Sequence, residues 1–244
     1  RPPGPHDAVD RECMTRALAA AATVRCATSP NPWVGAVVRT PDGRMFHGAT
    51  EAPGGAHAEI VALRQAGDQA RGATLYVTLE PCAHTGRTGP CTQAIIDAGI
   101  SRVVVGIEDP DPQVTGRGLD QLRAAGIDVT LGVQADHVAG QLTAYLTHRR
   151  TGRPYVVLKL AATLDGGTAA PNGTSQWITC PEARADGHRL RAESDAILVG
   201  AGTIRRDDPS LTVRDYRPPV MPAGGSVDPL RVVLGAVDDH ARVQ

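Results

Sequence analysis

Apolar residues along the first part of the chain recur in two rhythms, one helical and one typical of strands. From Asp7 to Thr23 the spacing predicts a helix with Asp7 as its N-cap. Its buried face would consist of Val9, Cys13, Ala17, Leu18 and Ala21. Apolar runs with β-branched residues predict strands at 35–40, 73–79 and 101–107, and 44–49 is expected to be the partner strand of 35–40.

Helical patterns alternate with these strands. They are found at 57–65, 91–99, 118–125 and 135–150, and a further strand follows 118–125. In the segment 57–65 we expect Ile60, Val61 and Leu63 to face inward. This alternation predicts an α/β fold with three layers, α/β/α.

A short polar linker at 149–153 precedes a second α/β pattern. The sequence predicts a strand at 154–166, a helix at 181–192, a strand at 195–200, a turn segment at 200–214 and a last strand at 230–235. A chain of 244 residues exceeds the usual size of one domain. We therefore expect two domains, at 1–148 and 152–244.

Composition narrows the classes of function. The net charge is only −1 and aromatic residues make up 3%, which argues against a polynucleotide-binding surface. The apolar runs are too short to span a bilayer. Five cysteines without an apolar signal segment favour a reducing compartment, so a cytoplasmic location is expected. The sequence leaves a monomer and a homodimer open.

The strongest chemical signal lies between Gly54 and Cys91. His57, Cys82 and Cys91 form a set of one imidazole and two thiolates suited to Zn²⁺, which leaves the fourth tetrahedral position for water. Glu59 in the His-Ala-Glu tripeptide is then free to carry protons, as in zinc-dependent base deaminases. The alternative is a structural zinc site closed by a fourth protein ligand, for which His84 is the candidate.

Other polar residues have two interpretations. Asn31 stands between two prolines, so its amide could read a base or ribose, or could cap its own turn. Asp109 and Asp111 could touch a sugar, although capping a turn is favoured. Between the two cysteines, the eight-residue loop AHTGRTGP adds His84 and Arg87, and a cation there suits a substrate phosphate.

These segments closely resemble a known family. The stretches TSPNPWVGAVV, HAE, TLEPCAHTGRTGPC and DPDPQVTGRG are similar to those of the bifunctional riboflavin biosynthesis proteins, in which a pyrimidine deaminase precedes a reductase. The resemblance implies Zn²⁺ ligation by His57, Cys82 and Cys91, and proton transfer by Glu59. One departure is Gly89, where the family usually has Pro.

The same resemblance implies the substrate and its contacts. The deaminase substrate would be a phosphorylated small-molecule pyrimidine, faced by Asn31, His84 and Arg87. The second half resembles a reductase domain that is similar in fold to dihydrofolate reductase and uses NADPH. Its implied NADPH residues are Ala161, Trp177, Thr203 and Asp207. Its implied substrate residues are Ser175, Arg191, Leu211 and Arg214.

The end of the chain departs from the family pattern. The family's reductase continues past the last strand of this sequence, so we expect only the N-terminal part of that domain and leave NADPH binding open. Lys159, the only lysine, lies in the first strand expected there, and its role stays open. Two other functions stand as alternatives: a polynucleotide base deaminase and a non-catalytic structural zinc module.

Overall fold

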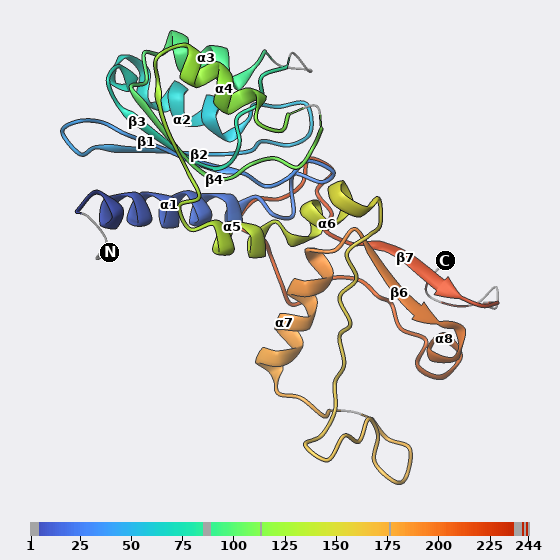
Figure 1. Ribbon diagram of the computed structural model, residues 1–244. Coiled ribbons are helices and arrows are strands. Elements are labelled where there is room, and N and C mark those ends of the chain that lie inside the picture. The colour runs from blue at the N-terminus through green and yellow to red at the C-terminus, as the bar shows by residue number, and fades with distance from the viewer. Residues whose placement is uncertain are drawn as a thin grey trace. The chain divides into compact units, whose positions relative to one another are not determined.

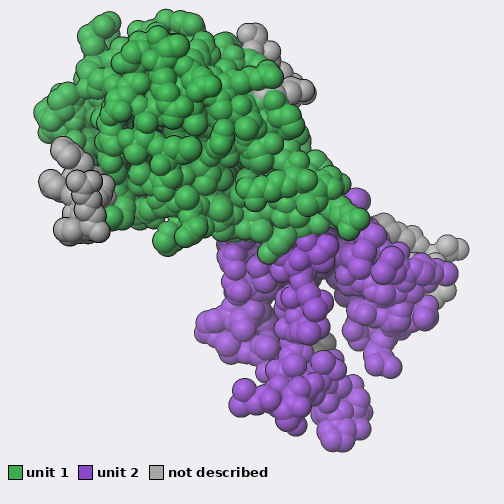
Figure 2. Space-filling view, in the orientation of Figure 1, with its two compact units in different colours: residues 1–155 green, residues 156–244 purple. Residues whose placement is uncertain are grey.

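The computed structural model describes residues 5–84, 89–112, 114–175, 177–236, 241 and 243, with the side chains of 5–7 left out. The chain divides into two compact units, Arg1–Tyr155 and Val156–Gln244, which Figure 2 distinguishes by colour. Each unit has its own strands and helices. In the described residues, no helix combines the length and apolar character that crossing a bilayer requires.

Unit 1 holds a five-stranded sheet in the order β2-β1-β3-β4-β5. The strands are β1 (Gly35–Arg39), β2 (Met45–Ala49), β3 (Thr74–Leu79), β4 (Arg102–Ile107) and β5 (Asp128–Leu131). β1 is antiparallel to β2 and β3, whereas β3, β4 and β5 are parallel. The carboxyl ends of β3 and β4 therefore lie at one edge of the sheet, and the loops that follow them meet there.

Helices cover both faces of this sheet (Figure 1). One face carries α1 (Pro5–Thr23) and α5 (Ala135–Gln141), and the other carries α2 (Ala58–Ala66), α3 (Cys91–Asp97) and α4 (Arg117–Ala124). A short 3₁₀ helix, η1 (Gly67–Ala70), follows α2, and α6 (Thr143–Thr151) follows α5. The predicted three-layer α/β/α arrangement is confirmed.

The core of unit 1 lies between these layers. Val37, Val77 and Val104 of the central strands are fully buried, and so is Cys13 of α1, which confirms the small buried hydrophobe expected there. Helix α1 approaches β1 so closely that a Cβ on Gly35 would lie 1.9 Å from the carbonyl oxygen of Ala17. Only glycine fits at that crossing.

Three details of unit 1 differ from the sequence prediction. α1 begins at Pro5, so Asp7 lies inside the helix and is not its N-cap. The single helix expected at 135–150 is broken at Leu142, whose φ of −95° and ψ of 15° are not helical. In α2, Ile60 and Val61 are only half-buried, because the helix turns Ala58, Glu59, Ala62, Leu63 and Ala66 inward.

Unit 2 contains α7 (Pro181–Ala192), β6 (Ala196–Gly200), α8 (Ala201–Asp207) and β7 (Leu230–Leu234). β6 and β7 form a parallel two-stranded sheet. The prediction of a strand at 154–166 was wrong: this segment has no strand structure, and Val156 and Leu158 are each 79% exposed. α8 was also missed, because the sequence 200–214 was expected to be a turn.

Candidate functional site

The candidate metal ligands come from the ends of three elements in unit 1. His57 is the N-cap residue of α2, with an extended backbone at φ −73° and ψ 160°. Cys82 follows the end of β3, and Cys91 is the first residue of α3. The turn before His57 is closed by the Ala56 N–H, which donates to Glu51 Oε2 at 2.7 Å.

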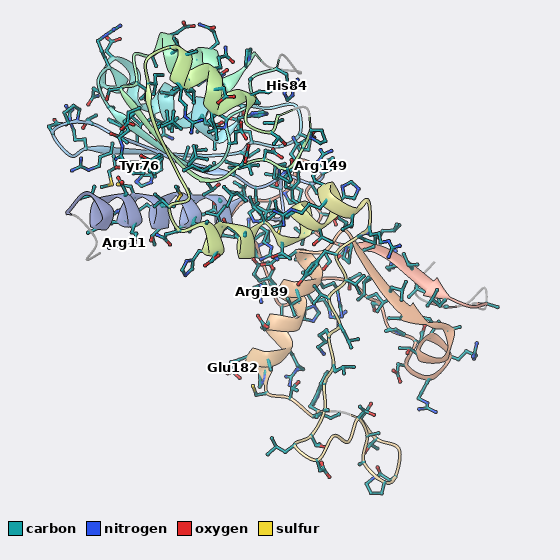
Figure 3. The ribbon with its side chains drawn as sticks, viewed as in Figure 1. Arg11, Tyr76, His84, Arg149, Glu182 and Arg189 are labelled. Carbon is teal, nitrogen blue, oxygen red and sulfur yellow. The ribbon has the colours of Figure 1, made fainter. Side chains whose placement is uncertain are left out.

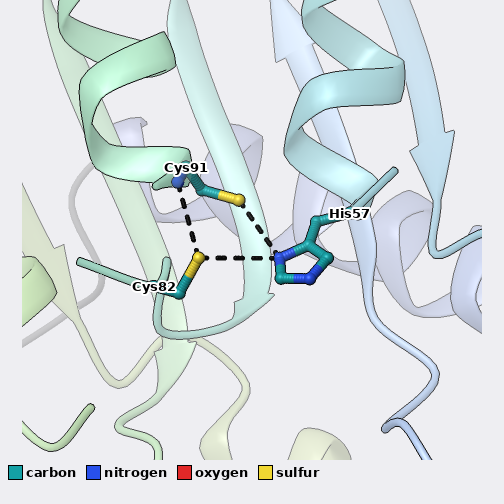
Figure 4. A group of neighbouring side chains, drawn as sticks. All are labelled: His57, Cys82 and Cys91. Atoms are coloured by element: carbon teal, nitrogen blue, oxygen red, sulfur yellow. Dashed lines mark hydrogen bonds between the residues drawn. The ribbon is translucent and has the colours of Figure 1, made fainter. Parts of the chain in front are cut away.

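Their side chains converge on one point (Figure 4). His57 Nδ1 lies 3.6 Å from Cys82 Sγ and 3.2 Å from Cys91 Sγ, and all three ligand atoms lie within 4.8 Å of one another. A tetrahedral Zn²⁺ with ordinary bond lengths would separate its nitrogen and sulfur ligands by about 3.5 Å. The donor set and its spacing therefore fit zinc.

Hydrogen bonds from α3 fix the first cysteine. The Cys91 N–H donates to Cys82 Sγ at 3.4 Å, and the Thr92 N–H donates to the Cys82 carbonyl oxygen at 3.2 Å. A hydrogen bond between the two cysteine side chains is the main cause that lowers the pKa of Cys82 to about 4. Hydrogen bonds with His57 and with the Cys91 N–H act in the same direction. The hydrogen bond between the cysteines, together with burial, raises the pKa of Cys91. These shifts favour the thiolate at Cys82, the form that binds metals.

Glu59 lies in the first turn of α2, two residues after His57, and is only 3% exposed. Burial raises the pKa of this carboxyl to about 7, although the nearby His57 opposes the shift. A carboxyl that titrates near neutral pH can both accept and release a proton under ordinary conditions. Glu59 is therefore suited to proton transfer beside the three ligand atoms.

The other residues predicted for the deaminase site are less fully described. His84 is exposed (Figure 3), and within the described residues the convergent group contains His57, Cys82 and Cys91 without it. Arg87 lies outside the described residues. Asn31 is half-buried in the loop before β1, where its N–H donates to the Thr28 carbonyl at 2.8 Å.

The loop before β1 reaches the same sheet edge as the cysteines. The Gly35 N–H donates to Thr78 Oγ1 at 3.2 Å, which joins the beginning of β1 to the last part of β3. Asn31 thus precedes a strand whose start lies beside the end of β3.

Asp109, in the loop after β4, has a capping role. Asp109 Oδ1 accepts the Asp111 N–H at 2.9 Å, and Tyr145 Oη donates to both carboxylate oxygens of Asp109 at 3.0 and 3.1 Å. Asp111 forms an ion pair with Arg149 at 3.3 Å. For Asp109, capping, the alternative favoured by the sequence, is what the structure shows.

One residue beside the cysteines was not recognised from the sequence. Glu80, directly after β3, is 4% exposed and accepts hydrogen bonds from four backbone N–H groups. The donors belong to Asp109, Gly116, Gly118 and Leu119. The sequence offered one signal for Glu80: an acidic residue directly after an apolar strand and directly before Pro-Cys.

In unit 2, the structure brings together part of the predicted reductase site. Arg191 on α7 donates to the Thr212 carbonyl, and Arg214 Nη1 donates to Thr212 Oγ1 at 3.1 Å. Leu211, next to Thr212, is buried and has a positive φ of 55°. Two arginines of the predicted substrate set therefore meet at one loop.

The remaining predicted residues of unit 2 lie on two segments. Thr203 and Asp207 are exposed on α8. Ala161 is half-buried, whereas Ser175 and Trp177 are exposed. The Trp177 ring stacks with the Arg184 guanidinium, whose carbon lies 4.4 Å from the ring centroid. The Lys159 side chain lies beside α7: a Cβ on Gly187 of that helix would be 3.6 Å from Lys159 Cε.

The fold and the three ligands define the first unit as a zinc-deaminase type of domain. Residues 7–107 match the family model described as the cytidine and deoxycytidylate deaminase zinc-binding region. Residues 154–243 match the model of the RibD C-terminal domain. The predicted order, a deaminase-like domain followed by a reductase-like domain in the α/β class, is confirmed by these matches.

Comparison with individual proteins identifies the family. The riboflavin biosynthesis protein RibD of Escherichia coli (strain K12) is 48% identical over 231 residues, which cover 92% of this chain and 63% of that protein. RibD of Mycobacterium tuberculosis (strain H37Rv) is 47% identical over 229 residues, with 93% and 66% covered. The chain belongs to the RibD family.

Solved structures agree with this family assignment. Acinetobacter baumannii RibD (form 1) superposes with a TM-score of 0.87 at 41% identity, covering 97% of this chain and 67% of that one. The Thermotoga maritima diaminohydroxyphosphoribosylaminopyrimidine deaminase/5-amino-6-(5-phosphoribosylamino)uracil reductase superposes with a TM-score of 0.85 at 40% identity. The matched region covers 94% of this chain and 64% of the Thermotoga maritima protein. The chain thus spans about two thirds of the length of these relatives.

Proposed function

We propose that unit 1 catalyses the hydrolytic deamination of a diaminopyrimidinone ribosyl phosphate to the corresponding aminouracil, a step of riboflavin biosynthesis. The observation that carries this proposal is the convergence of His57, Cys82 and Cys91 beside the buried carboxyl of Glu59. The membership in the RibD family supports the choice of substrate.

Zn²⁺ held by His57, Cys82 and Cys91 would supply acidity, since it lowers the pKa of a bound water from about 16 to about 7. Glu59 takes a proton from the attacking water and delivers it to the ring nitrogen next to the reacting carbon. It then takes the second proton from the hydroxyl now bound to that carbon and passes it to the leaving amine, so ammonia departs as the carbonyl forms. Glu59 is buried two residues after His57, so a single carboxyl lies where it can carry both protons.

We assign substrate contacts to three residues of unit 1. Arg87 would pair with the ribose phosphate, because guanidinium groups bind phosphates bidentately. His84, exposed at the start of the same loop, would stand beside it. Asn31 would hydrogen-bond the pyrimidine or ribose from the loop before β1.

The proposed domains are a deaminase at 1–148 and the N-terminal part of a reductase at 152–244. In the second, Arg191, Leu211 and Arg214 around Thr212, together with Ser175, would hold the substrate's phosphorylated chain. Ala161, Trp177, Thr203 and Asp207 would face NADPH. The meeting of Arg191 and Arg214 at one loop supports an anionic ligand there.

The expected partners are small molecules. A net charge of −1 and few aromatic residues give no support to nucleic-acid binding. A homodimer and a cytoplasmic location remain predictions, and the five free cysteines fit a reducing compartment.

The test is to incubate the zinc-loaded chain with the diaminopyrimidinone ribosyl phosphate, with and without NADPH, and to separate the products. Deaminated product in both reactions supports the deaminase, and a ribityl product only with NADPH supports a competent reductase. Unchanged substrate in both reactions would refute the proposed deaminase.

The competing proposal, a structural zinc module, requires a fourth protein ligand. Among the described residues the convergent group has three members, and His84 is exposed away from them. This arrangement favours a site that keeps one position for water.

A further inference from the structure

The carboxylate of Glu80 joins the segment after β4 to the turn that carries Cys82. Oε2 accepts the N–H groups of Asp109 at 3.2 Å and Gly116 at 3.1 Å. Oε1 accepts those of Gly118 at 3.0 Å and Leu119 at 3.3 Å. Every acceptor position of this buried carboxylate therefore faces the segment 109–119.

These bonds supply the N-terminal cap that α4 lacks. The N-cap residue of α4 is Gly116, which has a left-handed backbone at φ 73° and no side chain to accept a hydrogen bond. The first N–H groups of a helix need an acceptor and favour a negative charge. Glu80 provides both from its position directly after β3, so α4 is anchored to the residue two positions before Cys82.

The same helix is anchored to the other cysteine. Thr92 Oγ1, one residue after Cys91, donates to Gln121 Oε1 of α4 at 2.8 Å. In addition, Gly118 lies so close to the turn that a Cβ on it would meet the Pro81 carbonyl oxygen at 2.0 Å. α4 is thus held against the backbone next to both thiol ligands.

We propose that Glu80 is a positioning residue for the deamination: by capping α4, it holds the turn with Cys82 and the start of α3 with Cys91 at the spacing that zinc requires. Glu80 contacts backbone N–H groups and acts through the cysteines. This role rests on the proposed zinc-dependent function. Residues that orient metal ligands from behind typically change metal affinity or activity by about 10- to 100-fold when they are replaced.

The decisive variant is Glu80→Gln in the full zinc-loaded chain. The amide keeps the size of the side chain but replaces one oxygen by an NH₂ group, which would face two N–H donors. We expect zinc release to a chelator to accelerate by about 10-fold or more, and kcat per bound zinc to fall by a similar factor. KM should stay within about twofold, because the buried Glu80 does not reach the substrate.

Glu108→Gln is the matched control. Glu108 is exposed in the same segment, so this variant should keep the zinc release rate and kcat of the unmodified chain. If Glu80→Gln folds and matches the control in both quantities, the positioning role is refuted. The rate of zinc release can be measured without turnover. It therefore tests the positioning role of Glu80 even if the unmodified chain fails to deaminate the substrate.

A second measurement needs no variant. If Glu80 couples the metal site to α4, removing zinc from the unmodified chain must loosen the capped N–H groups, since coupling is reciprocal. We expect the amides of Gly118 and Leu119 to exchange with solvent about 10-fold faster after chelation, whereas those of Val37 and Val38 in β1 keep their rates. Unchanged exchange at Gly118 and Leu119 would overturn the proposal.

Discussion

Replacing Asp10 by alanine should strongly destabilise unit 1. Asp10 lies on α1, and its carboxylate accepts hydrogen bonds from Tyr76 Oη at 2.9 Å and from two nitrogens of Arg102 at 2.9 and 2.8 Å. The Asp10 side chain is 6% exposed and that of Arg102 is 25% exposed. One carboxylate therefore ties α1 to both β3 and β4 in a largely buried position.

The loss in free energy of unfolding depends on which contacts Arg102 keeps in the variant. Removing one partner of a buried pair costs about 3–5 kcal/mol, because the other charge is left without its partner. Arg102 would keep Thr130 at 2.9 Å and Asp128 at 3.3 Å, so we expect the lower limit, about 3 kcal/mol. For a chain of this size, that corresponds to a fall in the unfolding temperature of about 6–12 °C.

The assay is thermal unfolding of the zinc-loaded chain, with Glu12→Ala as the control. Glu12 lies on the same helix, but its ion pair with Arg16 has side chains 56% and 49% exposed. Such a pair contributes less than about 1 kcal/mol, so the control should unfold within a few degrees of the unmodified chain. Equal unfolding temperatures for the two variants would refute the reasoning about the buried network.

Three further predictions concern the site and unit 2. Glu59→Gln should keep zinc bound and lower kcat by about 10²- to 10⁴-fold, measured by ammonia release; turnover equal to that of Glu108→Gln would contradict the proton-transfer role. His84→Ala should retain one zinc per chain in a metal analysis, whereas loss of the zinc would indicate a closed structural site. Limited proteolysis should cut first within 153–180, whose described residues are mostly exposed and form no helix or strand, and mass spectrometry should then find unit 1 intact. Early cuts within β1 or β3 would contradict this order.

The sequence predicted the elements of unit 1 well where local pattern decides the structure. The apolar run at 35–38 predicts a buried strand, and the pattern around Cys91 marks the start of a helix. The three candidate metal ligands could be predicted because their residue types and order are characteristic. Their convergence depends on the end of β3 and the starts of α2 and α3 meeting at one place, which the residue pattern alone does not give.

Features that depend on distant partners could not be predicted in this way. The carboxylate oxygens of Glu80 accept hydrogen bonds from N–H groups that lie 29 to 39 positions further along the chain. No local sequence pattern therefore predicts this cap. The segment 154–166 has the composition of a strand, but a strand also needs a hydrogen-bonded neighbour. In the described part of unit 2, β6 and β7 pair with each other and not with this segment. Helix α8 was missed because Gly202 and the Asp-Asp-Pro sequence after it resemble a turn.

The most direct test of the central claim is the release of ammonia from the diaminopyrimidinone ribosyl phosphate by the chain in three states: zinc-loaded, chelated, and chelated with zinc restored. We predict one ammonia per substrate from the zinc-loaded chain, none above background after chelation, and recovery when zinc is returned. Ammonia release that continues at full rate after zinc removal, or its absence from the fully zinc-loaded chain, would contradict the account.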